Sequence, residues 1–234
     1  MWGAALYVLS LIGSEGSLSM GHLKCRRVPV TPLRQNCMVV SNETERAVVI
    51  DPGGDVADIL VALGDVQVEA ILLTHGHLDH AGGADELRAV LSEKQGARVP
   101  VLGPDRRDAF LLESICDQAA AFGLPGMRNV VPDQFLEHGA QLSLLGSSFD
   151  VRHVPGHTPG HVVFVNEEQG CSFVGDTLFR QTVGRTDFAY GDSEGLINAI
   201  RSELLSLPGE MIVYCGHGMP TTIEEERKNN PFFQ

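Results

Sequence analysis

Basic residues are scarce in this chain of 234 residues: 17 lysines and arginines stand against 30 aspartates and glutamates, for a formal net charge of −13. A protein that binds DNA or RNA needs positive surface to neutralise phosphates, so nucleic acid is not expected as the main partner. No apolar run approaches the roughly 20 residues that a membrane-spanning helix requires. The sequence therefore predicts no nucleic-acid partner and no membrane partner, although a local basic pocket for a small anionic substrate stays compatible with it.

Paired cysteines are also missing. The chain has five cysteines, an odd number, and no two of them form a Cys-x-x-Cys pair; they are Cys25, Cys37, Cys116, Cys171 and Cys215. This scatter is typical of reduced thiols and not of a disulfide framework or a cysteine zinc site. We therefore expect a cytoplasmic protein.

The length and the apolar fraction of 43% are sufficient for one domain with a packed core. The apolar run 2–12 has no lysine or arginine before it, and the Gly/Ser-rich stretch that follows has the composition of a linker, which disfavours a signal peptide. We expect residues 1–23 to form a loosely attached N-terminal extension and residues 24–234 to form the domain.

Strand and helix patterns alternate from Lys24 onward. Apolar, β-rich runs predict strands, and amphipathic spacing predicts helices. The expected strands are 26–30, 37–41, 47–50, 70–74, 99–102, 141–145, 149–153, 161–165, 172–174 and 211–214, and the expected helices are 56–63, 84–93, 108–122 and 194–207. Two batches of strands, each followed by a helix, favour a layered α/β architecture in which helices cover sheets.

The most informative segment is Leu-Thr-His-Gly-His-Leu-Asp-His (73–80), directly after an apolar strand. Its imidazoles and carboxylate together suit zinc, iron or manganese. His75 and His77 project alike from an extended segment, because side chains repeat every two residues there. Asp79 and His80 lie beyond that pair and could face a second ion. A polar loop with surface histidines is the alternative interpretation.

Three further segments each place one possible ligand at the end of an apolar strand. They are Pro-Gly-His-Thr-Pro-Gly-His with His157, Val-Gly-Asp-Thr with Asp176, and Cys-Gly-His-Gly with His217. Taken singly, a lone histidine or aspartate in such a place is more often structural. Taken with the first cluster, the three complete a ligand set for two ions.

These segments, together with Asp51 in Asp-Pro-Gly, resemble the metallo-β-lactamase superfamily, and the resemblance covers nearly everything from Lys24 to Gln234. It implies an α/β fold: a four-layer αββα sandwich of two mixed β-sheets flanked by helices. It also implies a binuclear metal site with one ion on three histidines, a second ion on a mixed triad and one bridging carboxylate. The implied ligands are His75, His77 and His157 for the first ion, Asp79, His80 and His217 for the second, and Asp176 as the bridge.

The resemblance gives roles to two other residues and none to a third. Asp51 would steady the histidine loop, because a ligating imidazole needs a hydrogen-bond partner for its other nitrogen. Arg185 has two interpretations: it contacts an anionic substrate at the mouth of the site, or it forms a buried ion pair with Asp187 or a similar residue that fixes its loop, because arginine favours such pairings. His161 matches no ligand position, so we expect it to begin a strand or to support a ligand.

Finer motifs resemble the glyoxalase II group, and the ending 215–232 resembles its short single-domain bacterial branch. The motifs are Thr-Pro-Leu-Arg-Gln-Asn-Cys (31–37), Val-Gly-Asp-Thr-Leu-Phe (174–179) and Val-Gly-Arg-Thr-Asp-Phe (183–188). This resemblance implies hydrolysis of thioesters such as S-lactoylglutathione by a hydroxide that bridges two divalent ions. Zinc is the expected metal, with iron or manganese as alternatives, and Asp79 and Asp176 are the candidate catalytic carboxylates. The long glyoxalase II enzymes grip glutathione with a C-terminal helical region, and this chain stops soon after His217, which puts the glutathione part of the substrate in doubt.

Other functions remain open at this point. A persulfide dioxygenase of the same fold also has a Gly-Arg-Thr-Asp-Phe stretch, and it would hold a single Fe(II) on His75, His157 and Asp176. A nuclease or phosphodiesterase of this fold is disfavoured by the acidic charge and the lack of a basic patch, and the penicillin-hydrolysing branch by an aspartate at position 176. A lactonase of this fold stays an alternative. A non-catalytic binding module would be expected to lack some ligands, and this chain retains all of them.

Overall fold

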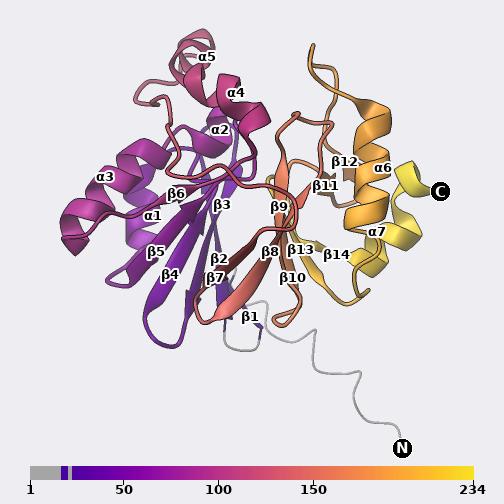
Figure 1. Cartoon of the computed structure of the whole chain (residues 1–234), viewed down its shortest axis with the longest axis horizontal. Helices are drawn as coiled ribbons and strands as arrows, with labels where there is room; N and C mark the ends of the chain where they lie inside the picture. The colour runs from indigo at the N-terminus through magenta and orange to yellow at the C-terminus, as the bar shows by residue number, and fades with distance from the viewer. Residues whose placement is uncertain (1–16, 21–22) are drawn as a thin grey trace, which may run out of the picture.

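The computed structural model describes residues 17–20 and 23–234 (Figure 1). Two six-stranded sheets face each other at its centre. In spatial order, the first sheet contains β1 (Ser17–Met20), β2 (Leu23–Val30), β3 (Gln35–Asn42), β4 (Arg46–Ile50), β5 (Gln67–Leu72) and β6 (Val101–Leu102). Strands β1 to β4 pair antiparallel, whereas β4, β5 and β6 run parallel, so the sheet is mixed.

The second sheet is mixed as well. In spatial order it contains β14 (Thr221–Thr222), β13 (Ile212–Cys215), β10 (Cys171–Gly175), β9 (Val162–Asn166), β8 (Ser147–His153) and β7 (Gln141–Leu144). Only β10 and β13 pair in parallel. A separate hairpin joins β11 (Leu178–Phe179) to β12 (Thr182–Val183).

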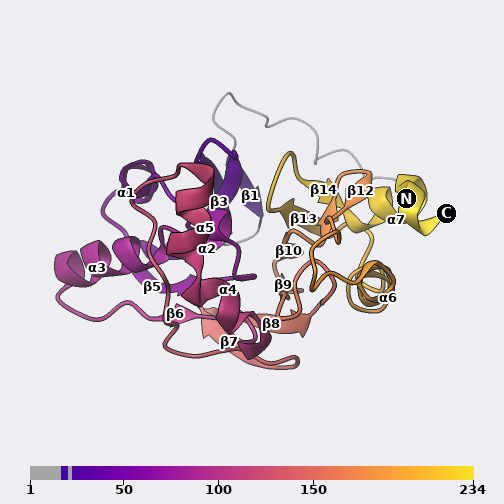
Figure 2. The same cartoon turned by 90° about the horizontal axis from the view of Figure 1, so that it is seen from above.

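Helices cover the outer faces of both sheets (Figures 1 and 2). Those of the first half are α1 (Val56–Leu63), α2 (Leu78–Ala81), α3 (Ala84–Gln95), the 3-10 turn η1 (Arg106–Asp108), α4 (Ala109–Glu113) and α5 (Ile115–Phe122). Those of the second half are α6 (Ser193–Glu203), α7 (Ile223–Asn229) and the 3-10 turn η2 (Pro231–Phe233). Within residues 17–20 and 23–234, no helix combines the length and apolar character needed to cross a membrane.

The two sheets and the helices on their outer faces form four layers of secondary structure. Three groups of buried apolar side chains fill the spaces between them. One lies between the first sheet and helices α1 and α3, one between the two sheets, and one between the second sheet and α6. Strand β4 shows how one sequence serves two of them: Val49 joins the helix-facing layer, while Val48 and Ile50 join the layer between the sheets. Successive side chains of a strand point to opposite faces, so a continuous apolar run suits a strand that is covered on both sides. The predicted αββα sandwich is confirmed.

Most expected elements are present with ends shifted by a few residues, such as β5 at Gln67–Leu72 in place of 70–74 and α6 at Ser193–Glu203 in place of 194–207. The expected single helix over 108–122 is broken at Ser114, whose backbone leaves the helical region at φ −111° and whose hydroxyl donates to the carbonyl of Phe110 instead. A serine hydroxyl competes in this way with the helical hydrogen-bond ladder. The short elements α2, β11, β12, β14 and α7 were not predicted, because two to seven residues carry too little periodicity to stand out.

The expected N-terminal extension, 1–23, lies partly outside the described residues. Its residues 17–20 form β1, which pairs antiparallel with β2, and Leu23 is buried between the sheets. We therefore propose that the domain begins at Ser17, seven residues earlier than the boundary expected above.

We predict that deleting residues 1–16 leaves the melting temperature and the activity unchanged, since the segment lacks the sequence pattern of a core element. Thermal denaturation of the shortened chain checks this. Deleting residues 1–20 is the matched comparison, because it also removes the backbone hydrogen bonds of β1 and should lower the melting temperature. A large destabilisation with the shorter deletion would contradict the proposed boundary.

Candidate metal centre

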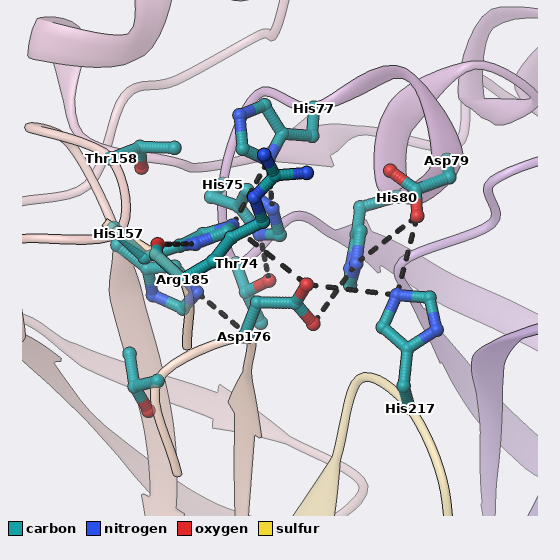
Figure 3. Close-up of polar contacts among 12 residues, drawn as sticks. Thr74, His75, His77, Asp79, His80, His157, Thr158, Asp176, Arg185 and His217 are labelled. Atoms are coloured by element: carbon teal, nitrogen blue, oxygen red, sulfur yellow. Dashed lines mark hydrogen bonds and ion pairs between the residues drawn. The ribbon is translucent and has the colours of Figure 1, made fainter. Parts of the chain in front are cut away.

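The predicted metal ligands lie at one edge of the sandwich, in loops that follow strands or, for Asp79 and His80, in the short helix α2. His75 follows β5, His157 follows β8, Asp176 follows β10 and His217 follows β13. In Figure 3 these side chains converge from the two halves of the molecule on one small volume. The structure therefore brings together residues that are up to 142 positions apart in the sequence, from 75 to 217.

Three histidines form the first cluster. Nδ1 of His77 lies 3.0 Å from Nε2 of His75 and 3.0 Å from Nε2 of His157. Burial lowers the pKa of all three, and that of His77 falls to about 3. The rings are therefore neutral at pH 7, which is the form that binds a metal. Three neutral nitrogens pointing at one another make a site for a cation.

The second cluster contains Asp79, His80 and His217, and its ligand atoms lie within 4.8 Å of one another. Nε2 of His217 is 3.2 Å from Oδ2 of Asp79, and Nε2 of His80 is 3.9 Å from the same oxygen. Although burial opposes it, the carboxylates of Asp176 and Asp79 hold the pKa of His80 well above its usual range. The local field thus favours positive charge at this position.

Asp176 lies between the two clusters. Its Oδ1 is 3.2 Å from Nε2 of His80, and its Oδ2 is 3.7 Å from Nε2 of His157 and 3.6 Å from Nε2 of His217. Gly216 allows this close packing, since a Cβ there would overlap Oδ1 of Asp176. One carboxylate therefore faces the histidines of both clusters.

Nε2 of His80 and Oδ1 of Asp176 face each other at 3.2 Å as an ion pair, and neither makes a hydrogen bond of regular geometry with any described residue. Buried polar atoms are rarely left unpaired, because each such atom costs about 1–3 kcal/mol. Both atoms point into the space between the clusters, where a cation would satisfy them. The donor set of imidazoles and carboxylates fits zinc, iron or manganese and offers no thiolate. The residues present therefore fit a divalent metal site.

Asp51 does not point into that space. It accepts hydrogen bonds from the backbone N–H of Thr74 at 2.7 Å and the hydroxyl of Thr74 at 2.6 Å, and its Oδ2 lies 2.9 Å from Nδ1 of His80. Its backbone is in the left-handed region at φ 53°, which is costly for a residue other than glycine. Although Asp51 also lies close to His75 and His80, its oxygens are already engaged in orienting the histidine loop.

Other contacts fix the outward nitrogens of the first cluster. Nδ1 of His157 lies 2.7 Å from the carbonyl of Arg185, and Nδ1 of His75 lies 3.1 Å from Oγ1 of Thr74. Nε2 of His77 lies 2.9 Å from the hydroxyl of Tyr190. Such contacts set the tautomer and the orientation of a ligating ring. Tyr190 was not predicted, because it follows no strand and belongs to no ligand motif.

Asp108 is a second residue that sequence reasoning missed. It is fully buried and accepts hydrogen bonds from the N–H of Gly76, the hydroxyl of Thr158 and the N–H of Gly160, at 2.9, 2.7 and 2.5 Å. Burial raises the pKa of Asp108 to about 6, and the three donors oppose that rise. This one carboxylate ties the loop of His75 and His77 to the loop of His157. In the sequence it resembled an ordinary residue at a helix start.

His161 supports the centre without entering either cluster. Its Nε2 accepts a hydrogen bond from the N–H of Asp176 at 3.1 Å, and its ring stacks on that of His75 at a centroid distance of 4.6 Å. An imidazole nitrogen that accepts a hydrogen bond carries no proton, so His161 is neutral. Burial lowers its pKa well below the usual value, which agrees with this assignment.

We predict that His161→Asn retains the full metal content and most of the activity, because His161 belongs to neither ligand cluster. The lost packing should lower the free energy of unfolding by about 1–3 kcal/mol. Metal analysis and denaturant titration of the purified variant check both parts. Loss of one metal equivalent would show that His161 is a ligand.

Arg185 forms an ion pair with Asp187, with Nε to Oδ1 and Nη2 to Oδ2 both at 2.7 Å. Its guanidinium also lies over the ring of Phe188, 4.6 Å from the ring centroid. The pair is exposed, with about two thirds of each side chain accessible, and Arg185 lines the cavity above the metal ligands. The pairing with Asp187 is therefore present but exposed, and not buried as that interpretation expected, while a contact of Arg185 with a substrate is compatible with its position.

A cavity of about 840 Å³ opens onto the centre. Its floor includes His77, Asp79, His157, Asp176 and His217, and its walls are largely apolar. A concave, mostly apolar cavity with a few convergent polar groups is the usual form of a small-molecule site. The ligand atoms are therefore accessible to a substrate.

The model of the metallo-beta-lactamase superfamily matches residues 30–217. The chain belongs to this superfamily. Hydroxyacylglutathione hydrolase GloC of Haemophilus influenzae is 43% identical over 208 residues, which are 88% of this chain and 95% of that protein. Family and clustered ligands together make the chain a metal-dependent hydrolase of the metallo-β-lactamase fold.

Two solved structures are similar over nearly their full length. The BLEG-1 B3 metallo-beta-lactamase is 34% identical with a TM-score of 0.81, covering 90% of this chain and 99% of that one. TTHA1623 in a di-iron-bound form is 38% identical with a TM-score of 0.76, covering 88% and 98%. These relatives share the fold but are named for different activities or bound metals. The substrate and the metal of this chain must therefore be inferred from its own site.

Proposed function

We propose that the protein hydrolyses thioesters of the glyoxalase II type, such as S-lactoylglutathione, with two divalent cations. His75, His77 and His157 would hold one cation, Asp79, His80 and His217 the other, and Asp176 both. The observation that carries the proposal is the position of Asp176, within 3.7 Å of histidine nitrogens from both clusters. The 43% identity to a hydroxyacylglutathione hydrolase supports the choice of thioester.

Two divalent cations, when bound, lower the pKa of water towards about 7 and polarise a carbonyl group. This chain's residues then supply position and charge. Asp176 and Asp79 offset the repulsion between two cations, because carboxylates in a site of low dielectric constant act strongly at short range. Every histidine in the two clusters would be engaged as a ligand, so none of them would be available as a separate general base. A thiolate is a good leaving group, so no strong protein acid is required.

The identity of the metal is part of the proposal. Imidazole and carboxylate ligands without thiolate accept zinc, iron and manganese alike. We propose zinc, with iron as the alternative that TTHA1623 suggests. We also propose a cytoplasmic location, which the five free cysteines support, since paired cysteines are expected in secreted proteins.

The test is hydrolysis of S-lactoylglutathione by chelator-treated protein before and after metal is restored. We expect the treated protein to be inactive and added zinc, iron or manganese to restore activity. The matched control is the Asp133→Asn variant. In the unaltered chain the Asp133 carboxylate accepts a hydrogen bond from the N–H of Val101, far from the centre, so its loss should not alter metal dependence. Hydrolysis that survives complete metal removal would refute the proposal.

A persulfide dioxygenase would leave Asp79, His80 and His217 without a role, although these residues form a compact second cluster. Oxygen uptake with glutathione persulfide, in place of thioester hydrolysis, would nevertheless select that alternative.

A further inference from the structure

The walls of the cavity differ in chemical character. One side has Leu33, in the loop between β2 and β3, Phe122 at the end of α5, and Met219 after β13. The β11–β12 hairpin and the loop that follows contribute both cations of the lining, Arg180 and Arg185, together with Thr182 and the aromatic or apolar Phe179, Val183, Phe188 and Tyr190. The ligand atoms lie on the floor of the cavity.

The apolar side is unusually exposed. Leu33, Phe122 and Met219 are 42%, 66% and 54% accessible, and they are three of the eight large apolar residues exposed among those that the structure describes. All three line the same cavity, whereas single exposed apolar residues are normally scattered over a surface. A cluster of exposed apolar side chains beside a polar site marks a place where a ligand is bound.

Of the two arginines, Arg180 is the available cation. Its guanidinium makes no ion pair with any residue in 17–20 or 23–234, while Arg185 is already paired with Asp187. Glutathione carries two carboxylates, so one uncommitted arginine cannot match both. The cavity therefore offers one anion site and one apolar surface.

We infer that the substrate is a thioester with an apolar acyl chain longer than lactoyl and a thiol part that carries at least one anionic group. This inference rests on the proposed thioester hydrolysis. The two arms of a thioester diverge from the carbonyl that must reach the metal ligands. Thiol carriers are polar or charged, so the thiol arm suits the side of Arg180. The acyl arm then lies against Leu33, Phe122 and Met219, and burial of each methylene group there strengthens binding.

The test compares a series of S-acylglutathiones on the metal-loaded full chain: acetyl, lactoyl, butanoyl, hexanoyl and octanoyl. We expect kcat/KM to rise by roughly two- to four-fold per added methylene group up to hexanoyl, mainly through a lower KM. Phe122→Ala and Leu33→Ala should each flatten this dependence. Val61→Ala is the matched control, because Val61 is 78% accessible on α1 and does not line the cavity.

A second comparison tests the anion site. Arg180→Gln should raise the KM for S-hexanoylglutathione several-fold and leave kcat and the KM for uncharged S-hexanoyl-N-acetylcysteamine unchanged. Equal effects on both thioesters would overturn the role of Arg180. A kcat/KM that stays flat or falls with chain length, on an enzyme that does hydrolyse thioesters, would overturn the acyl surface. Absence of hydrolysis for every thioester would instead contradict the proposed function itself.

Discussion

Asp176→Asn is expected to lower thioester hydrolysis by at least ~100-fold, the scale of losing one key electrostatic group in an active site. The substitution keeps the size of the side chain but removes the negative charge that faces His80, His157 and His217. A neutral amide offsets the repulsion between two cations far less than a carboxylate does. Metal content should therefore fall together with the rate, and steady-state kinetics with metal analysis of the purified variant measures both.

His161→Asn is the control for this prediction, because His161 touches the backbone of Asp176 but belongs to neither cluster. The expected pattern is loss of metal and activity at position 176 and retention of both at position 161. The reverse pattern would show that the ligand assignment is wrong at these two positions.

Asp108→Asn is expected to have the next largest effect. The amide group would turn N–H donors towards Gly76, Thr158 or Gly160, all of which already donate to position 108. A buried donor that faces other donors costs about 2–3 kcal/mol, so the melting temperature should fall by roughly 4–12 °C. The loops of His77 and His157 would lose their common anchor, and a displacement of about 1 Å can cost ~100-fold in rate.

Asp133→Asn separates positioning from general stability. Asp133 also accepts a backbone hydrogen bond, from the N–H of Val101, and pairs with Arg98, but it touches neither ligand loop. Both variants should lose stability, and only Asp108→Asn should bind metal more weakly in a calorimetric titration. Equal metal affinity in the two variants would show that Asp108 has a purely structural role.

The candidate ligands were predictable from the sequence because each of them stands in a short motif directly after an apolar strand. His75 and His77 are two positions apart, and His157 and His217 each lie between glycines or beside one. Local chemistry and spacing were sufficient there, because strand ends that share a sheet edge bring such residues together.

Asp108 and Tyr190 were not predictable, because their roles depend on contacts with residues 32 and 113 positions away. The break at Ser114 was not predicted, because the helical pattern of the sequence continues through it. Only the hydrogen bond from its hydroxyl to the carbonyl of Phe110 interrupts the helix. The two-residue strands β11 and β12 carry no periodicity, yet they place Phe179, Arg180 and Val183 along the cavity. Tertiary contacts thus decide the roles of Asp108 and Tyr190, whereas a local hydrogen bond accompanies the break at Ser114.

The most direct test of the binuclear assignment is a titration of metal-free protein with zinc, with thioester hydrolysis measured at each addition. Two filled clusters that share Asp176 predict activity that reaches its maximum close to two equivalents per chain. They also predict that His217→Ala, which removes a ligand from the second cluster only, holds close to one equivalent and loses most of the activity. Full activity at one equivalent, with His217 dispensable, would contradict the binuclear centre.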